Sequence, residues 1–232
     1  MNSGDLYSLF RSDVVDTAAP YLWTDTEVYA YMNDAYLSFA RLTGGIPDAT
    51  SSITRIPVQT GQMLAVVSPL ILRFRQAYLV STGEELKVVN DQDIASMQSV
   101  DYGQMRKIIM DNRPGPIRYM VTGLDRNRDG GTVRWVQTPA ANDSVALAVY
   151  RLPLDVIAEG DENFVFPDIG EEHIEYLMLR MKARAYGKQD AETFDRGRRD
   201  DYEKGFVAYC EAAKNEWERY KHKTRVVRYG GL

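Results

Sequence analysis

The sequence predicts an α+β protein in which helices from both ends of the chain form one discontinuous bundle, with an inserted antiparallel β-rich lobe between them. Apolar residues recur with helical spacing near both ends and alternate with polar residues in the middle, and glycine and proline mark the changes of period. The expected division is a helical bundle from residues 1–50 and 165–232, a β-rich insertion over 51–164 with one short helix, and a basic carboxy-terminal arm over 221–232.

The amino-terminal part predicts two helices. The stretch LYSLFRSDVV, residues 6–15, has apolar residues at helical spacing. Thr24 followed by Glu27 has the spacing of a capping box, which starts a second helix, and Gly44-Gly45 ends it because glycine readily adopts a left-handed conformation. The core-facing stripe of this second helix consists of Val28, Tyr31, Met32, Ala35, Phe39 and Leu42.

Two further tyrosines, Tyr29 and Tyr36, lie beside this stripe and widen the apolar arc beyond one packing surface. Two interpretations stay open. A tyrosine can bury its ring against its own subunit and keep the hydroxyl in water. Tyrosine is also favoured at protein interfaces, and on this interpretation Tyr29 and Tyr36 form a subunit interface with a neighbouring copy of the same chain.

The middle of the chain has the chemistry of strands. Predicted strands lie within SSITRIPVQ, LILRFRQAYLV, ELKVVN, PIRYMVTGL, GTVRWVQTP and DSVALAVYRLP, which are rich in β-branched and aromatic residues and are punctuated by turn residues. Residues 90–110 return to helical chemistry and predict the one short helix of the insertion.

From Pro167 onward the sequence predicts helices again. One apolar stripe consists of Ile174, Leu177, Met178, Met181 and Ala185, and a second of Tyr202, Phe206, Tyr209, Ala213, Trp217 and Tyr220. The single cysteine, Cys210, occupies an apolar helical position, which favours a buried and unreactive thiol.

Motifs that would carry catalysis or bind a metal are incomplete. The sequence DRNRDG, residues 125–130, matches the first half of a calcium-binding loop, but the twelfth position is Val136 and not the required glutamate, so a hairpin turn is predicted there. His173 and His222 lack metal-ligand spacing, and the common phosphate-binding and nucleophile motifs are missing. The sequence therefore predicts no catalytic residue, no metal and no cofactor.

Composition and charge give further expectations. With 44% hydrophobic and 26% charged residues, no apolar run of membrane-spanning length and no signal-peptide pattern, the chain of 232 residues is expected to be soluble and intracellularly made. Its net charge is -5, yet RYKHKTRVVRYGGL, residues 219–232, holds five Lys/Arg and no acid. Such a tail is either a solvated end or an arm that docks on an acidic partner or touches nucleic acid.

Three segments near the ends of the chain form a recognisable pattern. They are RAYGKQDAETFDRGRRDDYEKGFVAYCEAA, residues 184–213, then LFRSDVVDTAAPYLWTDTEVYAYMNDA, residues 9–35, and the approach through Pro167, Asp168, His173 and Leu177. The first segment resembles the carboxy-terminal helices of the head-to-tail adaptor proteins of tailed bacteriophages, the connector or tail tubular protein A-like family, and the other two look like the same family. The β insertion has no residue-by-residue match.

The resemblance implies a structural protein of the virion neck and no catalysis. It implies a homo-oligomeric ring, commonly of twelve copies, that joins the portal protein to the tail nozzle or tail tube protein after synthesis in the host cytoplasm. Genomic DNA would pass through the ring without sequence-specific binding, and a negatively charged body would discourage adhesion to the phosphates. No contact with a membrane is expected.

The basic tail is expected to act as a portal-binding arm. Its apolar residues would anchor an extended segment and its arginines would pair with carboxylates. The residues assigned to this arm are Lys221, Lys223, Arg225, Val226, Val227, Arg228 and Tyr229. The alternative to an adaptor is a soluble ligand-binding or hydrolytic domain with its site on the β insertion.

Overall fold

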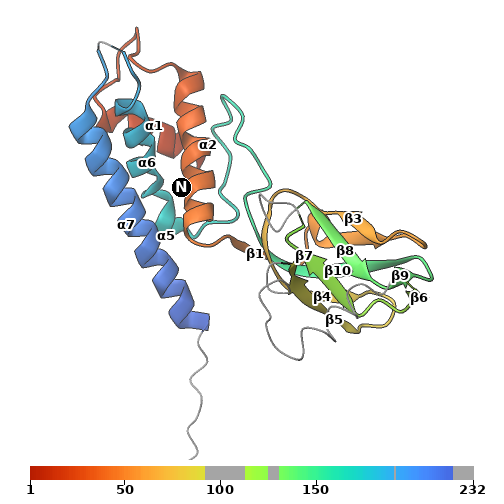
Figure 1. Ribbon diagram of the computed structural model, residues 1–232. Coiled ribbons are helices and arrows are strands. Elements are labelled where there is room, and N and C mark those ends of the chain that lie inside the picture. The colour runs from red at the N-terminus through yellow and green to blue at the C-terminus, as the bar shows by residue number, and fades with distance from the viewer. Residues whose placement is uncertain (92–112, 125–130, 191, 222–232) are drawn as a thin grey trace, which may run out of the picture. The chain divides into compact units, whose positions relative to one another are not determined.

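The chain folds into two compact units, and helices at both termini with strands between them confirm the α+β class (Figure 1). The computed structural model describes residues 1–91, 113–124, 131–190 and 192–221, with side chains as far as Arg219. Met1–Gly44 and Asp155–Leu232 form the helical unit, and Gly45–Leu154 form the β unit.

The helical unit contains helices from both ends of the chain: α1 (Ser3–Asp13), α2 (Asp25–Leu42), α5 (Glu171–Ile174), α6 (Leu177–Tyr186) and α7 (Arg196–Lys221). Helix α6 lies between α2 and α7 (Figure 1). The predicted capping box at the start of α2 is confirmed, because the Thr24 hydroxyl accepts from the Glu27 N–H and the Glu27 carboxylate accepts from the Thr24 N–H. Gly44 and Gly45 end α2 with φ of 95° and 92°, as the sequence predicts.

One hydrophobic core joins these helices. Phe10 and Trp23 from the amino-terminal part pack with Met181 and Phe206 from the carboxy-terminal part, and all four are 2% exposed or less. The first apolar stripe predicted after Pro167 is confirmed, since Ile174 of α5 and Leu177, Met178, Met181 and Ala185 of α6 all belong to this core. The two ends of the chain therefore form one discontinuous bundle, as their common helical period predicts.

Residues 155–170, called the covering segment below, belong to the helical unit. The Asn33 amide of α2 donates to the Ile157 carbonyl and accepts from the Ile157 N–H, both at 2.8 Å. The Ser3 N–H of α1 donates to the Phe164 carbonyl at 3.0 Å. The predicted boundaries at 50 and 164 are therefore corrected to Gly44/Gly45 and Leu154/Asp155. The sequence predicts residues 155–164 as part of the insertion because their apolar residues follow no helical period.

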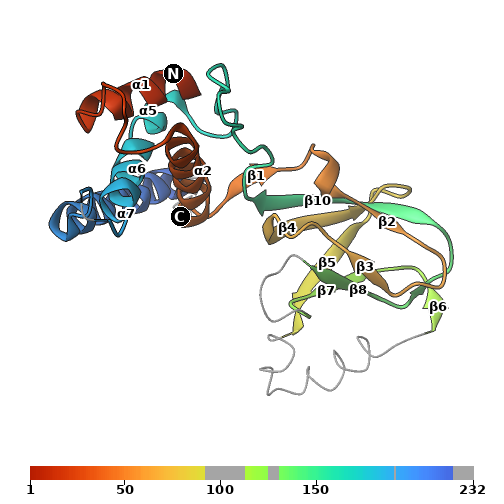
Figure 2. The same ribbon diagram turned by 90° about the horizontal axis from the view of Figure 1, so that it is seen from above.

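The β unit contains an eight-stranded sheet in the order β1-β10-β4-β5-β7-β8-β3, with β2 also paired to β10 (Figure 2). Its strands are β1 (Ile46–Asp48), β2 (Arg55–Val58), β3 (Leu64–Val66), β4 (Ile71–Leu79), β5 (Glu85–Asn90), β7 (Tyr119–Thr122), β8 (Thr132–Val136) and β10 (Asp143–Arg151). A short 3-10 helix (Ser52–Thr54) precedes β2, and β6 (Pro114–Gly115) pairs with β9 (Thr138–Pro139). The inner face of the large sheet buries Trp135, Met120, Ile71 and Leu147.

Most strand pairs of the β unit are antiparallel, as the sequence predicts, and two pairs are parallel. Strand β5 pairs with β7 in parallel, and β6 pairs with β9 in parallel. A parallel neighbour requires a long connection, and here more than twenty residues separate β5 from β7. The short helix predicted within residues 90–110 lies almost wholly outside the described residues.

Candidate functional site

The structure corrects the prediction of a subunit interface at Tyr29 and Tyr36, because both rings are used inside the chain. Tyr36 is 2% exposed; its ring meets those of Phe164 and Phe166 edge-on, with centroids 6.4 and 5.4 Å away, and its hydroxyl donates to Asp168 at 3.1 Å. Three of the residues around it come from the covering segment. The wide aromatic arc of α2 is thus explained by a second intramolecular contact.

Tyr29 lies in the same core and is 5% exposed. Its ring stacks on that of Tyr7 from α1, with centroids 5.7 Å apart. Burial raises the pKa of Tyr29, and the negative charges of Glu162, Asp161 and others add to the rise. Asp161 and Glu162 of the covering segment are thus close enough to act electrostatically on this ring, and both are exposed to solvent.

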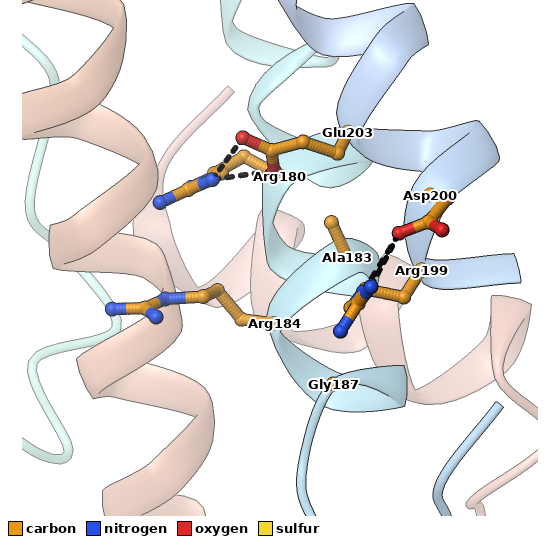
Figure 3. A pocket seen from close by; sticks show the side chains of 7 residues that line it. All are labelled: Arg180, Ala183, Arg184, Gly187, Arg199, Asp200 and Glu203. Atoms are coloured by element: carbon orange, nitrogen blue, oxygen red, sulfur yellow. Dashed lines mark hydrogen bonds and ion pairs between the residues drawn. The ribbon is translucent and has the colours of Figure 1, made fainter. Parts of the chain in front are cut away.

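A groove of about 420 Å³ between α6 and α7 is lined by five charged side chains (Figure 3). It is lined by Arg180, Ala183, Arg184 and Gly187 from α6 and by Arg199, Asp200 and Glu203 from α7. The Arg180 guanidinium donates through Nε to Asp34 of α2 at 2.7 Å and through Nη1 to Glu203 of α7. Arg180 therefore joins three helices through one side chain.

The remaining charges in the groove are also paired. Arg184 donates to Asp34 at 3.1 Å, and Arg199 donates to Asp200 at 2.9 and 2.6 Å. Burial lowers the pKa of Arg180, but its hydrogen bonds with Asp34 and Glu203 outweigh this effect and raise the pKa overall. Each of the three lining arginines has a carboxylate partner, namely Asp200 or Glu203 in the lining or Asp34 on α2, and the lining holds no nucleophile. The ion pairs of Arg180 with Asp34 and Glu203 therefore act as a clamp on α7.

On the carboxy-terminal side of the clamp, apolar contacts hold α7 in the core. Phe206, Cys210 and Ala213 are 0%, 1% and 4% exposed. Burial raises the pKa of the Cys210 thiol to about 12, which agrees with the predicted unreactive role. Trp217 is only partly buried, the next two residues are exposed, and α7 continues to Lys221. The helix therefore leads from a fixed position in the core directly to the basic tail.

His173 is a core residue and not a ligand in this arrangement. It is 5% exposed, its Nδ1 lies 2.8 Å from the Tyr209 hydroxyl oxygen, and its ring packs against Phe39 and Trp217. Burial raises the pKa of Tyr209 to about 12. These contacts connect α5 to α2 and α7 near the carboxy-terminal part of the bundle.

The β unit has a groove of its own, of about 420 Å³, which would hold the site of the alternative function. Its lining includes Leu79, Ile117 and Pro139, and the polar pair Ser81 and Asp143, whose hydroxyl and carboxylate oxygens are 2.5 Å apart. Burial raises the pKa of Asp143, but hydrogen bonds from Ser81 and from the Ser144 N–H outweigh it and lower the pKa. A carboxylate of lowered pKa is a weak general base, so the pair favours a turn-stabilising role.

Several predicted features fall on residues that the structure does not describe. Residues 223–229 of the arm lie outside the described residues, and Lys221 is described only as the last residue of α7. The sequence DRNRDG, 125–130, also lies outside them, but the flanking strands β7 and β8 pair antiparallel, as the hairpin prediction requires. Among the described residues, no group of three His, Cys, Asp or Glu side chains is placed to hold a metal ion.

The clamp was missed at the level of sequence, although a signal for it exists. Arg180 and Arg184 are four residues apart and so lie on one side of α6, where they can share an acidic partner. The partner, Asp34, lies on α2, 146 residues from Arg180, and only the tertiary fold identifies it.

No helix in the described part of the chain is both long and apolar enough to cross a bilayer. No family model matches the sequence, and a search of curated proteins finds no match.

Proposed function

We propose that this chain is a structural head-to-tail adaptor of a tailed bacteriophage. Copies of it assemble into a ring, commonly of twelve, that joins the portal protein to the tail nozzle or tail tube protein. The genome passes through this ring without sequence-specific binding. The protein resides in the neck of the virion after synthesis in the host cytoplasm, and it catalyses no reaction.

The observation that carries the proposal is the way in which α7 is held. Arg180 connects α7 to α2 and α6, and Phe206 and Cys210 bury the middle of α7 in the core. A helix anchored over this length gives a defined starting point for the basic stretch 219–232, with its five Lys/Arg. An arm with a fixed origin loses less entropy on docking than one attached through a flexible linker.

The family resemblance supports the same function. The segments that resemble the adaptor family, residues 9–35 and 184–213, both fall within the helical unit and pack in one core. The arm residues Lys223, Arg225 and Arg228 supply cations, and Val226 and Val227 supply apolar anchors, for a groove on the portal protein.

A reconstruction of the particle neck tests this function directly. The expected result is a ring of this chain between portal and tail, with residues 221–232 laid on the portal protein. In a matched binding experiment, deletion of residues 222–232 is expected to leave thermal unfolding unchanged and to abolish attachment to filled heads. A truncated chain that joins portals with undiminished affinity at low salt, where charge contacts are strongest, contradicts the arm.

The second candidate is a soluble ligand-binding or hydrolytic domain, for which the groove beside Ser81 and Asp143 is the supporting observation. This groove predicts binding of a small, partly apolar ligand. Ligand-induced shifts in the resonances of Leu79 and Ile117, together with absence of the protein from purified virions, would favour this candidate over the adaptor.

A further inference from the structure

The outer face of the β-unit sheet carries an excess of positive charge. Arg55, Arg73, Arg75 and Lys87 are exposed on it, and these four residues are called the cationic sheet face below. Strand register places three of them on the same side of the sheet: Arg55 is opposite Ala146, Arg73 is opposite Tyr150, and Lys87 is opposite Tyr119. Arg75 lies over the Tyr150 ring and so belongs to the same side. This is the side of the sheet that faces away from the main β core.

Three of these cations, Arg73, Arg75 and Lys87, have aromatic neighbours, and within the described residues none of the four has a carboxylate partner. The guanidinium carbons of Arg73 and Arg75 lie 4.5 and 5.4 Å from the centre of the Tyr150 ring, and the Lys87 nitrogen lies 5.9 Å from the centre of the Tyr119 ring. Tyrosine contacts orient a cation without neutralising it. The face is therefore preorganised to meet negative charge.

The helical unit carries the opposite charge, and the covering segment concentrates it. The helical unit contains sixteen Lys/Arg and twenty-three Asp/Glu, whereas the β unit contains twelve Lys/Arg and ten Asp/Glu. From residue 152 to 179 there are eight acids and no Lys/Arg. Asp155, Glu159, Asp161 and Glu162 are exposed and, among the described residues, form no ion pair with Lys or Arg.

The covering segment also offers apolar surface between its acids. Val156 and Val165 are 78% and 66% exposed, although hydrogen bonds from Ile157 to Asn33 and from Ser3 to Phe164 hold the backbone next to each of them. A surface with exposed valines and unpaired carboxylates is suited to a partner that supplies both cations and aromatic rings.

We propose that the cationic sheet face of one copy of the chain packs on the covering segment of a second copy. The proposal rests on the ring of the proposed function and specifies the contact between neighbouring subunits. The two surfaces are different patches of one chain, so the contact is heterologous and can repeat from copy to copy until a ring closes. Opposite charges on the two patches select this pairing over self-pairing of either patch.

Nucleic acid is the competing partner for a cationic face with tyrosines, and two observations disfavour it. Tyr150 is 7% exposed beneath Arg73 and Arg75, so its ring does not offer a free surface for a base. The chain as a whole carries a net charge of -5, which repels a polyanion at long range.

Complementary charge reversals test the contact in the full-length protein. The sheet variant carries Arg73→Glu and Arg75→Glu, and the segment variant carries Asp161→Lys and Glu162→Lys. Controls carry Lys204→Glu or Glu211→Lys, which are exposed positions on α7 outside both surfaces. Sedimentation velocity over a concentration series at low salt measures self-association, and thermal unfolding by circular dichroism verifies that each variant is folded.

The expected result is loss of association by each reversed variant alone, about tenfold or more in the association constant, because like charges then face each other. The controls should associate as the wild type does. An equimolar mixture of the two reversed variants should regain association, because every contact between alternating copies again joins opposite charges. The regained association also shows that neither variant failed through misfolding.

Three results would overturn this inference. Wild-type protein that never self-associates, reversed variants that associate as the wild type does, or a mixture that stays dissociated each exclude the contact. A different result would identify nucleic acid as the partner of the cationic sheet face. In that case the sheet variant, but not the segment variant, loses binding to a DNA fragment, and mixing the two variants does not restore self-association. A ring seen in the particle neck together with insensitivity to the reversals would refute this contact and leave the adaptor function standing.

Discussion

The indole Nε1–H of Trp23 donates a hydrogen bond to the backbone carbonyl of Ala185, across 3.1 Å and 162 residues of sequence. The ring is 2% exposed and meets the rings of Phe10 and Tyr186 edge-on. The Trp23 side chain thus connects the segment before α2 to the end of α6. Its ring packs against apolar neighbours, and its N–H forms the hydrogen bond.

Trp23→Ala is expected to lower the free energy of unfolding by about 3–5 kcal/mol, because it empties a large buried volume. Trp23→Phe keeps most of the ring and loses the hydrogen bond, so its cost should be about 1–3 kcal/mol. Urea unfolding followed by circular dichroism measures both. Equal effects of the two substitutions would show that ring volume is not what the site requires.

The burial of α7 predicts a gradient along this helix. Phe206→Ala should cost about 3–5 kcal/mol, since the ring is fully buried. Trp217 is only partly buried, so Trp217→Ala should cost less than Phe206→Ala in the same urea titration. A larger effect at Trp217 would mean that the lower part of α7 contributes more to the core than its exposure indicates.

Arg180→Met is expected to destabilise the helical unit by about 1–3 kcal/mol, because Asp34 and Glu203 lose a shared partner that is only 17% exposed. Arg184→Met is the matched control, since the Arg184 side chain is 52% exposed and its pair should contribute at most about 1 kcal/mol. Urea unfolding compares the two variants. Arg180→Lys should recover only part of the loss, as one ammonium does not reproduce the planar guanidinium.

The ion pair between Asp48 and Arg151 predicts acid sensitivity in the β unit. Burial raises the pKa of Asp48, but hydrogen bonds from the backbone of Thr50 and Ser51 and from Arg151 outweigh it and hold the pKa well below the ordinary value of 3.8. A carboxylate with a lowered folded-state pKa contributes its full stability above the unfolded-state pKa, and this contribution is lost as the pH falls below it.

Asp48→Asn should therefore cost about 3–5 kcal/mol near neutral pH, as both side chains of the pair are less than 10% exposed. The difference between wild type and Asp48→Asn should shrink as the pH is lowered through about 4 and beyond. Urea titrations at a series of pH values measure this difference. A difference that is constant between neutral and strongly acidic pH would contradict the assigned pKa direction.

Cys210 is expected to resist thiol reagents in the folded protein, because burial raises its pKa to about 12 and leaves it 1% exposed. Labelling with a maleimide should be slow in buffer and rapid in denaturant. Fast labelling in buffer would mean that α7 opens frequently around this position.

Local signals account for the elements that the sequence predicts well. The capping box at Thr24 and Glu27 defines where α2 begins, and alternation over nine residues defines β4 and β10. Strands β1 and β3 have three residues each, which is too short for alternation to be visible. Their positions depend on the partners that they find in the sheet.

The role of Tyr36 was mispredicted for a different reason. A helical wheel shows that its ring lies outside the main stripe, but it cannot show what covers that side. The cover comes from Phe164 and Phe166, which lie about 130 residues away in a segment without periodicity. The charges of the clamp at Arg180 share this difficulty, since each residue looks like an ordinary solvated charge until its partner on another helix is known.

The pairing of β1 with β10 has a consequence for how such a chain can change over evolution. Ile46 lies opposite Arg151, so the chain enters and leaves the β unit through adjacent strands of one ladder. An insertion whose two ends are neighbours can be shortened, enlarged or exchanged for another domain without moving the termini of the host bundle. The helical unit can therefore keep its core while the inserted unit diversifies to suit different neighbours.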